Sequence, residues 1–449
     1  MSLDELDLAT GVPGPISARV RLLGGRRVSW LEFDPVEPAA PLTQAMTQIW
    51  ETAARTAHDE RIPFVMVINS AGADIREGIA ALDGWGRVAR ALTRCSGNVP
   101  TFAIVDGPAV SGPALLLGLV DFTIMTSTAY AFVNGPVMVR QITGIDVSKD
   151  ELGNASAMEK HGGLSVTVVA DRPAGAEVIE HLLEYLPDHA DESPPHRASS
   201  DPLDRPCPEA GELVPESSTG SYDVRHVAEA IADDDSLFEL RGGWAGNVVT
   251  AFATFGGRPV GIVANQPMNL AGTLDIPASQ KAARFVAFCD AFNLPIITLV
   301  DTPGFYPGKD LEWRGMIRHG AQLVYAYGRA TVPRVCVILR KSYGGAFIVM
   351  DSKTMGNDIC LAWPWAELAV MGAGQAAAIL QRGAADEDRA AFESDYADRL
   401  LNPYVAAERG YVDAVVDPAD TRREIGAALS MLADKREVLP RRKHGNTPL

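Results

Sequence analysis

The same strand–turn–glycine layout occurs twice in this chain, once in each half. In the first half, VMVINSAG (65–72) is followed by DGPAVSGPALLLG (106–118). In the second half, PIITLVDTPG (295–304) is followed by RKSYGGAFIVM (340–350). Each copy has the pattern of an apolar strand, a turn, a second apolar strand and small residues that open a helix. Alternating strands and helices predict α/β domains, and the repeat predicts two copies of one fold.

The glycine turn of the second half predicts an anion-stabilising pocket. Backbone N–H groups at a helix start have no intrahelical partner and can hold a developing oxyanion. Gly344 and Gly345 let the backbone approach a substrate closely, and Gly345 and Ala346 place two N–H groups where the helix begins. The alternative is a glycine turn that serves only tight strand–helix packing, because short glycine motifs often match by chance.

The equivalent turn of the first half is Val110-Ser111-Gly112-Pro113. Pro113 has no N–H, so only Ser111 and Gly112 can donate a backbone hydrogen bond from this turn. Proline also suits the first position of a helix, so this turn fits a helix start better than a full pair of donors. Two such pockets in one chain predict a reaction in which two carbonyl-type oxygens gain charge.

Composition limits the class of protein. The chain has 449 residues, enough for two ordinary domains, and its 47% apolar and 22% charged residues are typical of a globular protein. The net charge of −17 argues against nucleic acid or an anionic membrane as the main partner. No apolar run approaches the length of a membrane span, and the acidic N-terminus has no signal-peptide pattern.

The five cysteines are scattered without a CxxC pair, which fits a reducing cytosol and gives no metal site. We therefore expect a cytoplasmic protein. No Gly-x-Ser-x-Gly nucleophile elbow and no phosphate-binding loop occur. His161 and His319 have no triad partners nearby in the sequence, so a loop or interface role is favoured for each.

The domain organisation follows from composition. We expect an N-terminal domain over 1–186, a linker over 187–222 that is rich in Pro, Ser and acidic residues, and a C-terminal domain over 223–449. The linker pattern fits a segment that wraps a surface as well as a disordered tether.

The ends of the two domains give weaker signals than their centres. Residues 1–50 are predicted to be irregular apart from a strand over 27–34. The second domain is expected to contain a Gly-Gly hairpin over 246–265 and a charged C-terminal helix over about 421–437.

The chain resembles the carboxyltransferase (beta) subunits of biotin-dependent acyl-CoA carboxylases. The resemblance covers roughly 60–449 and is dense from 240 onward, for example in VDTPGFYPGKDLEWRGMIRHGAQLVYAYGRATVPRVCVILRKSYGGAFIVM and in LAWPWAELAVMGAGQAAAIL. It implies two tandem crotonase-like domains and a homo-oligomeric ring, typically a hexamer. In the family, an acyl-CoA and a carboxybiotin meet between the N domain of one subunit and the C domain of another.

The resemblance implies roles for the two turns. Gly345 and Ala346 would bind the ureido oxygen of biotin, with Tyr343 and Gly344 beside them. Ser111 and Gly112 stand where the family normally has two glycines that hold the acyl thioester oxygen and stabilise an enolate. The biotin nitrogen freed of CO2 would act as base, so no acid–base side chain is needed.

The remaining implied positions concern the acyl substrate. Ser70, Ala71 and Gly72 correspond to the start of the family's SGGAR segment, which continues here as Ala73-Asp74. Ile348 occupies a pocket position that is often Asp in propionyl-preferring members, so it resembles members that accept acetyl-CoA or longer acyl chains. The departures fall on the CoA side and suggest an unusual acyl substrate, such as a carrier-bound thioester.

The chain has no Met-Lys-Met biotinylation site and no ATP-grasp region, so a separate biotin carboxylase and biotin carrier are implied as partners. Two other functions remain open from the sequence. One is decarboxylation of, or transcarboxylation between, malonyl-type thioesters, because both turns would stabilise the same enolate. The other is a noncatalytic ring subunit, which the altered first-half turn suggests.

Overall fold

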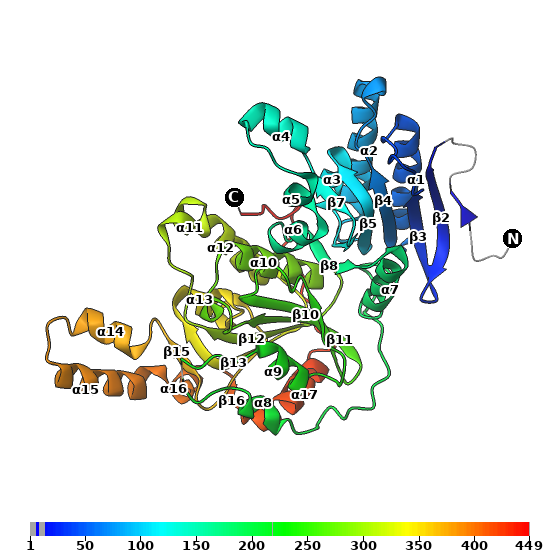
Figure 1. Ribbon diagram of the computed structural model, residues 1–449. Coiled ribbons are helices and arrows are strands. Elements are labelled where there is room, and N and C mark those ends of the chain that lie inside the picture. The colour runs from blue at the N-terminus through cyan, green and yellow to red at the C-terminus, as the bar shows by residue number, and fades with distance from the viewer. Residues whose placement is uncertain (1–5, 9–13, 218, 449) are drawn as a thin grey trace. The chain divides into compact units, whose positions relative to one another are not determined.

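The computed structural model describes residues 6–8, 14–217 and 219–448. The chain forms two compact units, one comprising Met1–Pro195 with Arg241–Trp244 and the other His196–Leu240 with Ala245–Leu449 (Figure 1). Each unit contains a sheet with eight described strands, most of them parallel. No described helix is long and apolar enough to cross a membrane.

The first unit has strand order β1-β2-β3-β4-β5-β6-β8, with β7 paired to the end of β5. The strands are β1 Leu6–Asp7, β2 Ile16–Leu23, β3 Arg26–Phe33, β4 Phe64–Ser70, β5 Thr101–Val110, β6 Phe122–Thr126, β7 Tyr130–Phe132 and β8 Ser165–Val169. The helices are α1 Gln44–Glu60, η1 Ile75–Glu77, α2 Ile79–Cys95, α3 Gly112–Leu117, α4 Pro136–Thr143, α5 Lys149–Gly153, α6 Ala155–Lys160 and α7 Arg172–Leu183.

The second unit repeats this order as β16-β14-β13-β12-β11-β10-β9, with β15 paired to the end of β13. The strands are β9 Phe238–Leu240, β10 Val248–Phe255, β11 Arg258–Asn265, β12 Ile296–Thr302, β13 Arg334–Tyr343, β14 Ile359–Ala362, β15 Glu367–Ala369 and β16 Ala414–Val415. The helices are α8 Pro208–Glu212, α9 Val224–Ile231, η2 Leu270–Gly272, α10 Ile276–Ala291, α11 Lys309–Trp313, α12 Met316–Arg329, α13 Gly344–Val349, η3 Lys353–Met355, α14 Ala373–Leu380, α15 Asp386–Tyr396, η4 Ala397–Leu401, α16 Pro403–Glu408, η5 Pro418–Asp420 and α17 Thr421–Met431. The predicted α/β class and internal duplication are confirmed.

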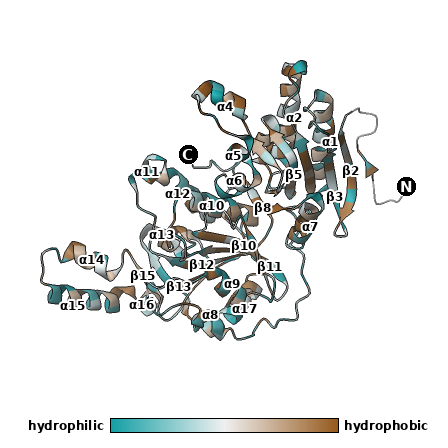
Figure 2. Cartoon of the chain, viewed as in Figure 1, coloured by the Kyte–Doolittle hydropathy of each residue, from teal (hydrophilic) through white to brown (hydrophobic). Residues whose placement is uncertain are grey.

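The central strands are apolar because helices cover both faces of each sheet (Figure 2). Every residue of β4 and β12 is buried. In the first unit, Trp50 of α1 and Val88 of α2 join the core beneath β4, while α7 contacts β5 and β6 on the other face. In the second unit, α9 and α17 share a core with the sheet, and α10 contacts β10 and β11.

Each unit contains a tight hairpin that joins its first two long strands. Gly256 and Gly257, with φ of 56° and 77°, connect β10 to β11 and confirm the hairpin predicted over 246–265. Gly24 and Gly25, with φ of 56° and 78°, connect β2 to β3 in the same way. The prediction of an irregular N-terminus was wrong here, because β2 alternates buried apolar and partly exposed positions.

The segment predicted as a linker is packed against the two units. Its first part contacts the first unit, where the Ala190 N–H donates to the Asn98 carbonyl at 2.9 Å. Its later part contacts the second unit, where the Cys207 N–H donates to the Ala419 carbonyl at 2.8 Å and α8 forms. The disordered-tether alternative does not describe this segment. At the C-terminus, α17 ends at Met431, earlier than predicted, because the charged residues that follow are largely exposed.

Candidate active site

The two glycine turns sit on the same backbone frame in both units. Near their ends, β5 and β13 each have two more residues than the strand paired with them. Between β4 and β5, the pair Ile68↔Val105 is followed by Ser70↔Ala109. Between β12 and β13, the pair Val300↔Ile338 is followed by Thr302↔Ser342. This shared irregularity aligns the end of β5 with the end of β13. Ser111 therefore corresponds to Gly344, Gly112 to Gly345 and Pro113 to Ala346.

The loops after β4 and β12 are also duplicated. Gly72 and Gly304 have φ of +102° and +138°, which favours glycine at both positions. Each glycine N–H lies near the hydroxyl two residues before it, at 3.4 Å from Ser70 Oγ and 3.3 Å from Thr302 Oγ1. The carbonyl oxygen of Gly72 accepts from Leu42 N–H at 2.7 Å.

The same backbone pairing recurs in the second unit. The Gly304 carbonyl accepts from Leu274 N–H at 3.1 Å. The segments around Ser70 and Thr302 therefore occupy equivalent positions in the two units.

The start of α13 presents free backbone donors. Tyr343 is its N-cap and makes no capping hydrogen bond with its side chain, so the first N–H groups, those of Gly344, Gly345 and Ala346, have no intrahelical partner. Gly344 has φ of +60°, and a Cβ there would lie 3.3 Å from the Val370 carbonyl oxygen. Gly345 is exposed, with the Phe305 ring at one side. The predicted donors Gly345 and Ala346 are thus at an uncapped helix start.

The start of α3 has fewer donors. The Ser111 N–H donates to the Phe132 carbonyl oxygen at 2.9 Å, because β5 continues its pairing with β7 to this point. The backbone donor predicted at Ser111 is therefore already used within the fold. Pro113 occupies the first turn of α3 and has no N–H. Gly112 remains, and it is buried with the Trp85 ring 3.3 Å from the position of a Cβ.

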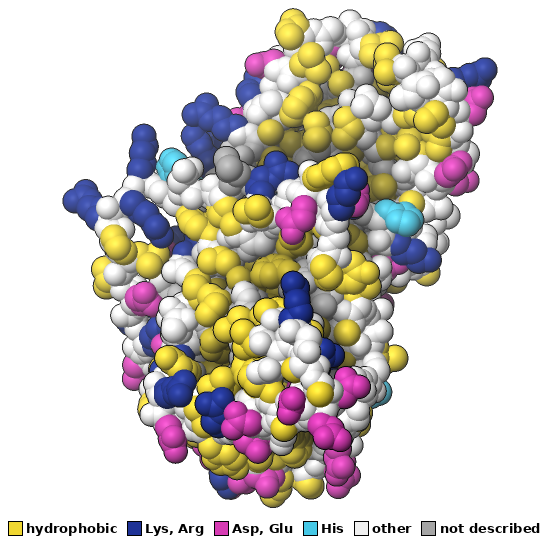
Figure 3. Space-filling view, turned by 90° about the vertical axis from the view of Figure 1, so that its left-hand side faces the viewer, with side chains coloured by type: hydrophobic (Ala, Val, Ile, Leu, Met, Phe, Trp, Pro, Cys, Tyr) yellow, Lys and Arg dark blue, Asp and Glu magenta, His cyan; other side chains and the backbone are white. Residues whose placement is uncertain are grey.

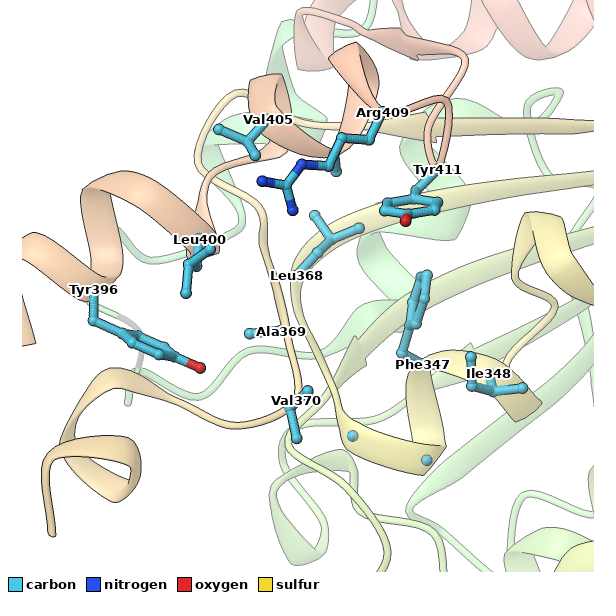
Figure 4. Close-up of a pocket in the computed structure, with 13 residues that line it drawn as sticks. Phe347, Ile348, Leu368, Ala369, Val370, Tyr396, Leu400, Val405, Arg409 and Tyr411 are labelled. Atoms are coloured by element: carbon cyan, nitrogen blue, oxygen red, sulfur yellow. The ribbon is translucent and has the colours of Figure 1, made fainter. Parts of the chain in front are cut away.

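A cavity of about 540 Å³ lies at the start of α13 (Figure 4). Its walls come from α13, from β15 and the residue after it, and from the segment between α15 and Tyr411. The lining residues are Gly344, Gly345, Phe347, Ile348, Leu368, Ala369, Val370, Tyr396, Leu400, Val405, Ala406, Arg409 and Tyr411. In Figure 4, the lining residues Leu368, Ala369 and Val370 lie between Tyr396 on one side and Phe347 on the other.

The cavity is mostly apolar and has one charged lining residue, Arg409. It contains no carboxylate and no histidine, so its described residues supply no conventional general base. Ile348, predicted as a substrate-binding residue, lies in α13 one turn after Gly345 and lines the same cavity. The sequence did not identify the wall formed by α15, η4 and α16, because these short polar elements match no motif.

Tyr343 fixes the loop that forms one wall of this cavity. Its hydroxyl donates to a carboxylate oxygen of Glu367 in β15, and its ring lies against Gly372. Burial, followed by the hydrogen bond to Glu367, raises the pKa of Tyr343 well above its usual value. The phenol therefore stays protonated, and its contacts in the structure suit support of the cavity wall.

Buried ion pairs hold β13 on both sides of its apolar centre. Arg334 Nη1 contacts Asp351 Oδ1 at 2.6 Å, and Arg340 Nη2 contacts Asp301 Oδ2 at 3.0 Å. Arg340 also donates to the carbonyl oxygens of Ser217 and Gly220 at 2.7 and 2.8 Å. Burial raises the pKa of Asp351, and the nearby Arg334 opposes this shift.

The comparisons with known proteins agree with this architecture. The carboxyl transferase domain profile matches residues 24–447. The chain is 46% identical over 406 residues to the propionyl-CoA carboxylase beta chain of Saccharopolyspora erythraea, covering 86% of this chain and 74% of the relative. It is also 46% identical over 392 residues to the methylmalonyl-CoA carboxyltransferase 12S subunit of Propionibacterium freudenreichii subsp. shermanii, covering 86% of this chain and 75% of the relative.

A solved structure of the transcarboxylase 12S hexamer, with hydrolysed methylmalonyl-CoA bound, matches with a TM-score of 0.94 and 42% identity. The match covers 97% of this chain and 85% of that one. The two units are therefore tandem crotonase-like domains, as the resemblance implied. From the profile match and these identities, the chain belongs to the carboxyl transferase domain family.

Proposed function

We propose that this protein transfers a carboxyl group from carboxybiotin, held on a separate carrier protein, to the α-carbon of an acyl-CoA. One observation in the structure supports this most directly. The uncapped start of α13 opens into a mostly apolar cavity, so backbone donors and an apolar wall meet at one place. Backbone donors aimed at a developing negative charge are a major source of catalysis in water-excluded sites.

The residues of this cavity fit a biotin ring. A fused apolar ring system with one polar urea needs apolar walls and donors for a single oxygen. Gly345 lines the cavity, and the N–H of the buried Ala346 follows it at the helix start. When bound, carboxybiotin supplies an activated carboxyl group. The chain's part is to hold the urea oxygen, with Tyr343 and Gly344 shaping the turn beneath it.

The acyl thioester is assigned to the first unit. The Ser70–Ala71–Gly72 turn faces the β5–α3 junction, because a Cβ on Gly72 would lie 3.2 Å from the Val110 carbonyl oxygen. We propose that this junction holds the thioester oxygen and stabilises the enolate that accepts the carboxyl group. We further propose that Ile348, an apolar residue at the wall of the second-unit cavity, favours an apolar acyl group beside the biotin ring.

The proposed function also requires partner proteins, an oligomeric state and a location in the cell. A biotin carboxylase and a biotin carrier must be supplied by other proteins, and a homo-hexamer is supported by the likeness to the 12S hexamer. The exposed apolar residues Val370, Ile379 and Leu380 are available for subunit contacts. Figure 3 shows hydrophobic side chains exposed among charged ones on one face of the molecule. All five cysteines are free, which supports a cytoplasmic location.

The test is reconstitution. The purified protein, combined with a biotin carboxylase and a biotinylated carrier, should carboxylate at least one member of a panel of acetyl-, propionyl- and longer acyl-CoA substrates in an ATP- and bicarbonate-dependent assay. Presenting the same acyl groups on a carrier protein shows whether the enzyme uses CoA thioesters or carrier-bound thioesters. Absence of turnover with every panel member, from a correctly assembled protein, would contradict the proposal.

A second candidate is transcarboxylation, favoured by the likeness to methylmalonyl-CoA carboxyltransferase. The same two donor sites would serve transfer in the reverse direction, from a malonyl-type thioester to biotin. Loss of CO2 from malonyl- or methylmalonyl-CoA that depends on added free biotin, and that exceeds the forward rate, would favour this candidate.

A further inference from the structure

Ser111 adopts a backbone conformation that serine rarely occupies. Its φ and ψ are 61° and −117°, a region that is strained for any residue with a Cβ. The equivalent residue of the second unit is Gly344, with φ of +60°, for which this φ has no steric cost. Serine therefore retains a strained geometry at a place where the other copy of the fold uses glycine.

This geometry is that of a strand–nucleophile–helix elbow. Ser111 follows β5 directly and precedes α3, with small or compact residues, Ala109 and Pro113, two positions before and after it. In such elbows a sharp turn exposes the serine hydroxyl beside the backbone N–H of the next residue. The turn was predicted from the repeat, but its elbow geometry was not, because it lacks the flanking glycines of the usual motif.

The Ser111 hydroxyl is available to a ligand. Ser111 is exposed, and its side chain makes no capping hydrogen bond with α3. Within the described part of the chain, this hydroxyl has no hydrogen-bond partner. Its Cβ lies 3.6 Å from where a Cβ on Gly72 would be, so the side chain starts between the Ser70–Gly72 turn and the start of α3.

The hydroxyl also compensates for a missing donor. The second-unit turn has adjacent N–H groups on Gly345 and Ala346, whereas the corresponding residues of the first unit are Gly112 and Pro113. Pro113 contributes no donor, and the Ser111 N–H is used by Phe132. The first-unit turn thus has one backbone donor, on Gly112, and one free hydroxyl beside it.

We propose that the Ser111 hydroxyl is a catalytic hydrogen-bond donor that, with the Gly112 N–H, holds the thioester oxygen of the acyl substrate as it gains charge. This rests on the proposed carboxyltransferase function. No histidine, lysine or carboxylate is paired with the hydroxyl in the described structure, so it is not activated as a nucleophile. The residue acts by donation, and no covalent bond to the substrate forms.

The test compares Ser111→Gly and Ser111→Ala with the wild type in the reconstituted carboxylase assay. Both variants lack the hydroxyl, and we expect both to lose about 10²-fold in kcat. Ser111→Gly also removes the backbone strain, so its melting temperature should be no lower than that of the wild type. A loss of rate without a loss of stability separates the donor role from a structural one.

A matched control is Asp235→Gly, at an exposed non-glycine residue with φ of 53° outside the proposed site. It should leave kcat unchanged. A Ser111→Gly enzyme as active as the wild type would overturn the inference and leave the proposed function intact. An inactive wild type in the same assembly would instead count against the proposed function.

Intact-mass measurement of the wild type after incubation with acyl-CoA completes the test. We expect no adduct. An acyl group found on Ser111 would show a nucleophile in place of a donor and would overturn the inference.

Discussion

The two strand-to-helix junctions share one backbone frame but differ in the groups that they present. At the end of β13, Gly344 takes a positive φ without strain, and the amides of the exposed Gly345 and the buried Ala346 follow. At the end of β5, Ser111 takes a similar φ at a steric cost, and Pro113 removes one amide. The same backbone frame therefore presents different hydrogen-bond donors in the two units.

The strands that carry the two junctions are also stabilised by different interactions. Arg340 and Asp301 form a buried ion pair beside the second junction. The equivalent positions of the first unit are Gly107 and Asn69, and a Cβ on Gly107 would lie 3.1 Å from the Asn69 side chain. The second junction is held by charge and the first by close packing.

The largest expected effect concerns this difference. Arg340→Met leaves Asp301 buried without its cation and removes the donors to Ser217 and Gly220, so we expect a loss of about 3–5 kcal/mol in the free energy of unfolding. Arg172→Met, which breaks partly exposed pairs with Glu32 and Asp106 in the first unit, should cost less. Urea unfolding midpoints of the two variants, compared with that of the wild type, measure both losses of stability. Equal losses would show that charge is no more important to the second unit than to the first.

The next effect concerns the second junction itself. Gly345→Asp places a carboxylate beside the Gly345 and Ala346 N–H groups, near the Phe305 ring, so it competes with the substrate oxygen. We expect a loss of at least about 10²–10³ in kcat, measured in the reconstituted assay. Gly86→Asp is the matched control, because a Cβ at Gly86 meets nothing within 4 Å. Unchanged activity in Gly345→Asp would favour the noncatalytic ring subunit.

A smaller effect is expected from a substitution that gives the first junction the backbone donors of the second. Pro113→Ala restores the N–H that Ala346 supplies in the other unit. In the Ser111→Gly background it should recover about tenfold of the lost kcat, because a second backbone donor replaces the hydroxyl. Pro113→Ala alone should change kcat little. Failure of the double variant to recover, with its fold intact by circular dichroism, would show that the junctions are not equivalent in function.

The smallest effect concerns the loop after β4. The side-chain hydrogen bond from Arg76, with the Arg76 backbone N–H, lowers the pKa of Asp74 to about 2. A carboxyl whose pKa falls on folding stabilises the native state above its unfolded pKa, and that contribution is lost as the pH falls towards 2. The difference in urea midpoint between wild type and Asp74→Asn should therefore be constant from about pH 8 to 5 and shrink below about pH 4. A difference that shrinks near neutral pH would contradict this.

The centre of each unit could be predicted from the sequence, and its edges only in part. Continuous apolar runs such as 295–301 identify strands covered on both faces, and the paired glycine turns mark the junctions. The hairpin of β2 and β3 was missed because arginines alternate with its small apolar residues. The cavity could not be predicted, since α15 and η4 reach β15 only through tertiary packing.

The chemistry of the first junction was predicted only in part. Its position followed from the repeat, and the missing donor at Pro113 followed from residue type. That the Ser111 N–H is used by Phe132 depends on the pairing of β5 with β7, which links residues distant in sequence. The strained conformation of Ser111 could not be predicted either, because no short motif around it specifies a positive φ.

The irregularity shared by β5 and β13 has a consequence for protein engineering. Since both strands gain two residues before their glycine turns, residues 109–114 and 342–347 are segments of equal length that start at equivalent positions of the two sheets. The two segments can therefore be exchanged without inserting or deleting a residue. A graft of either segment into the other unit would therefore keep the chain length between sheet and helix while exchanging the groups that the junction presents.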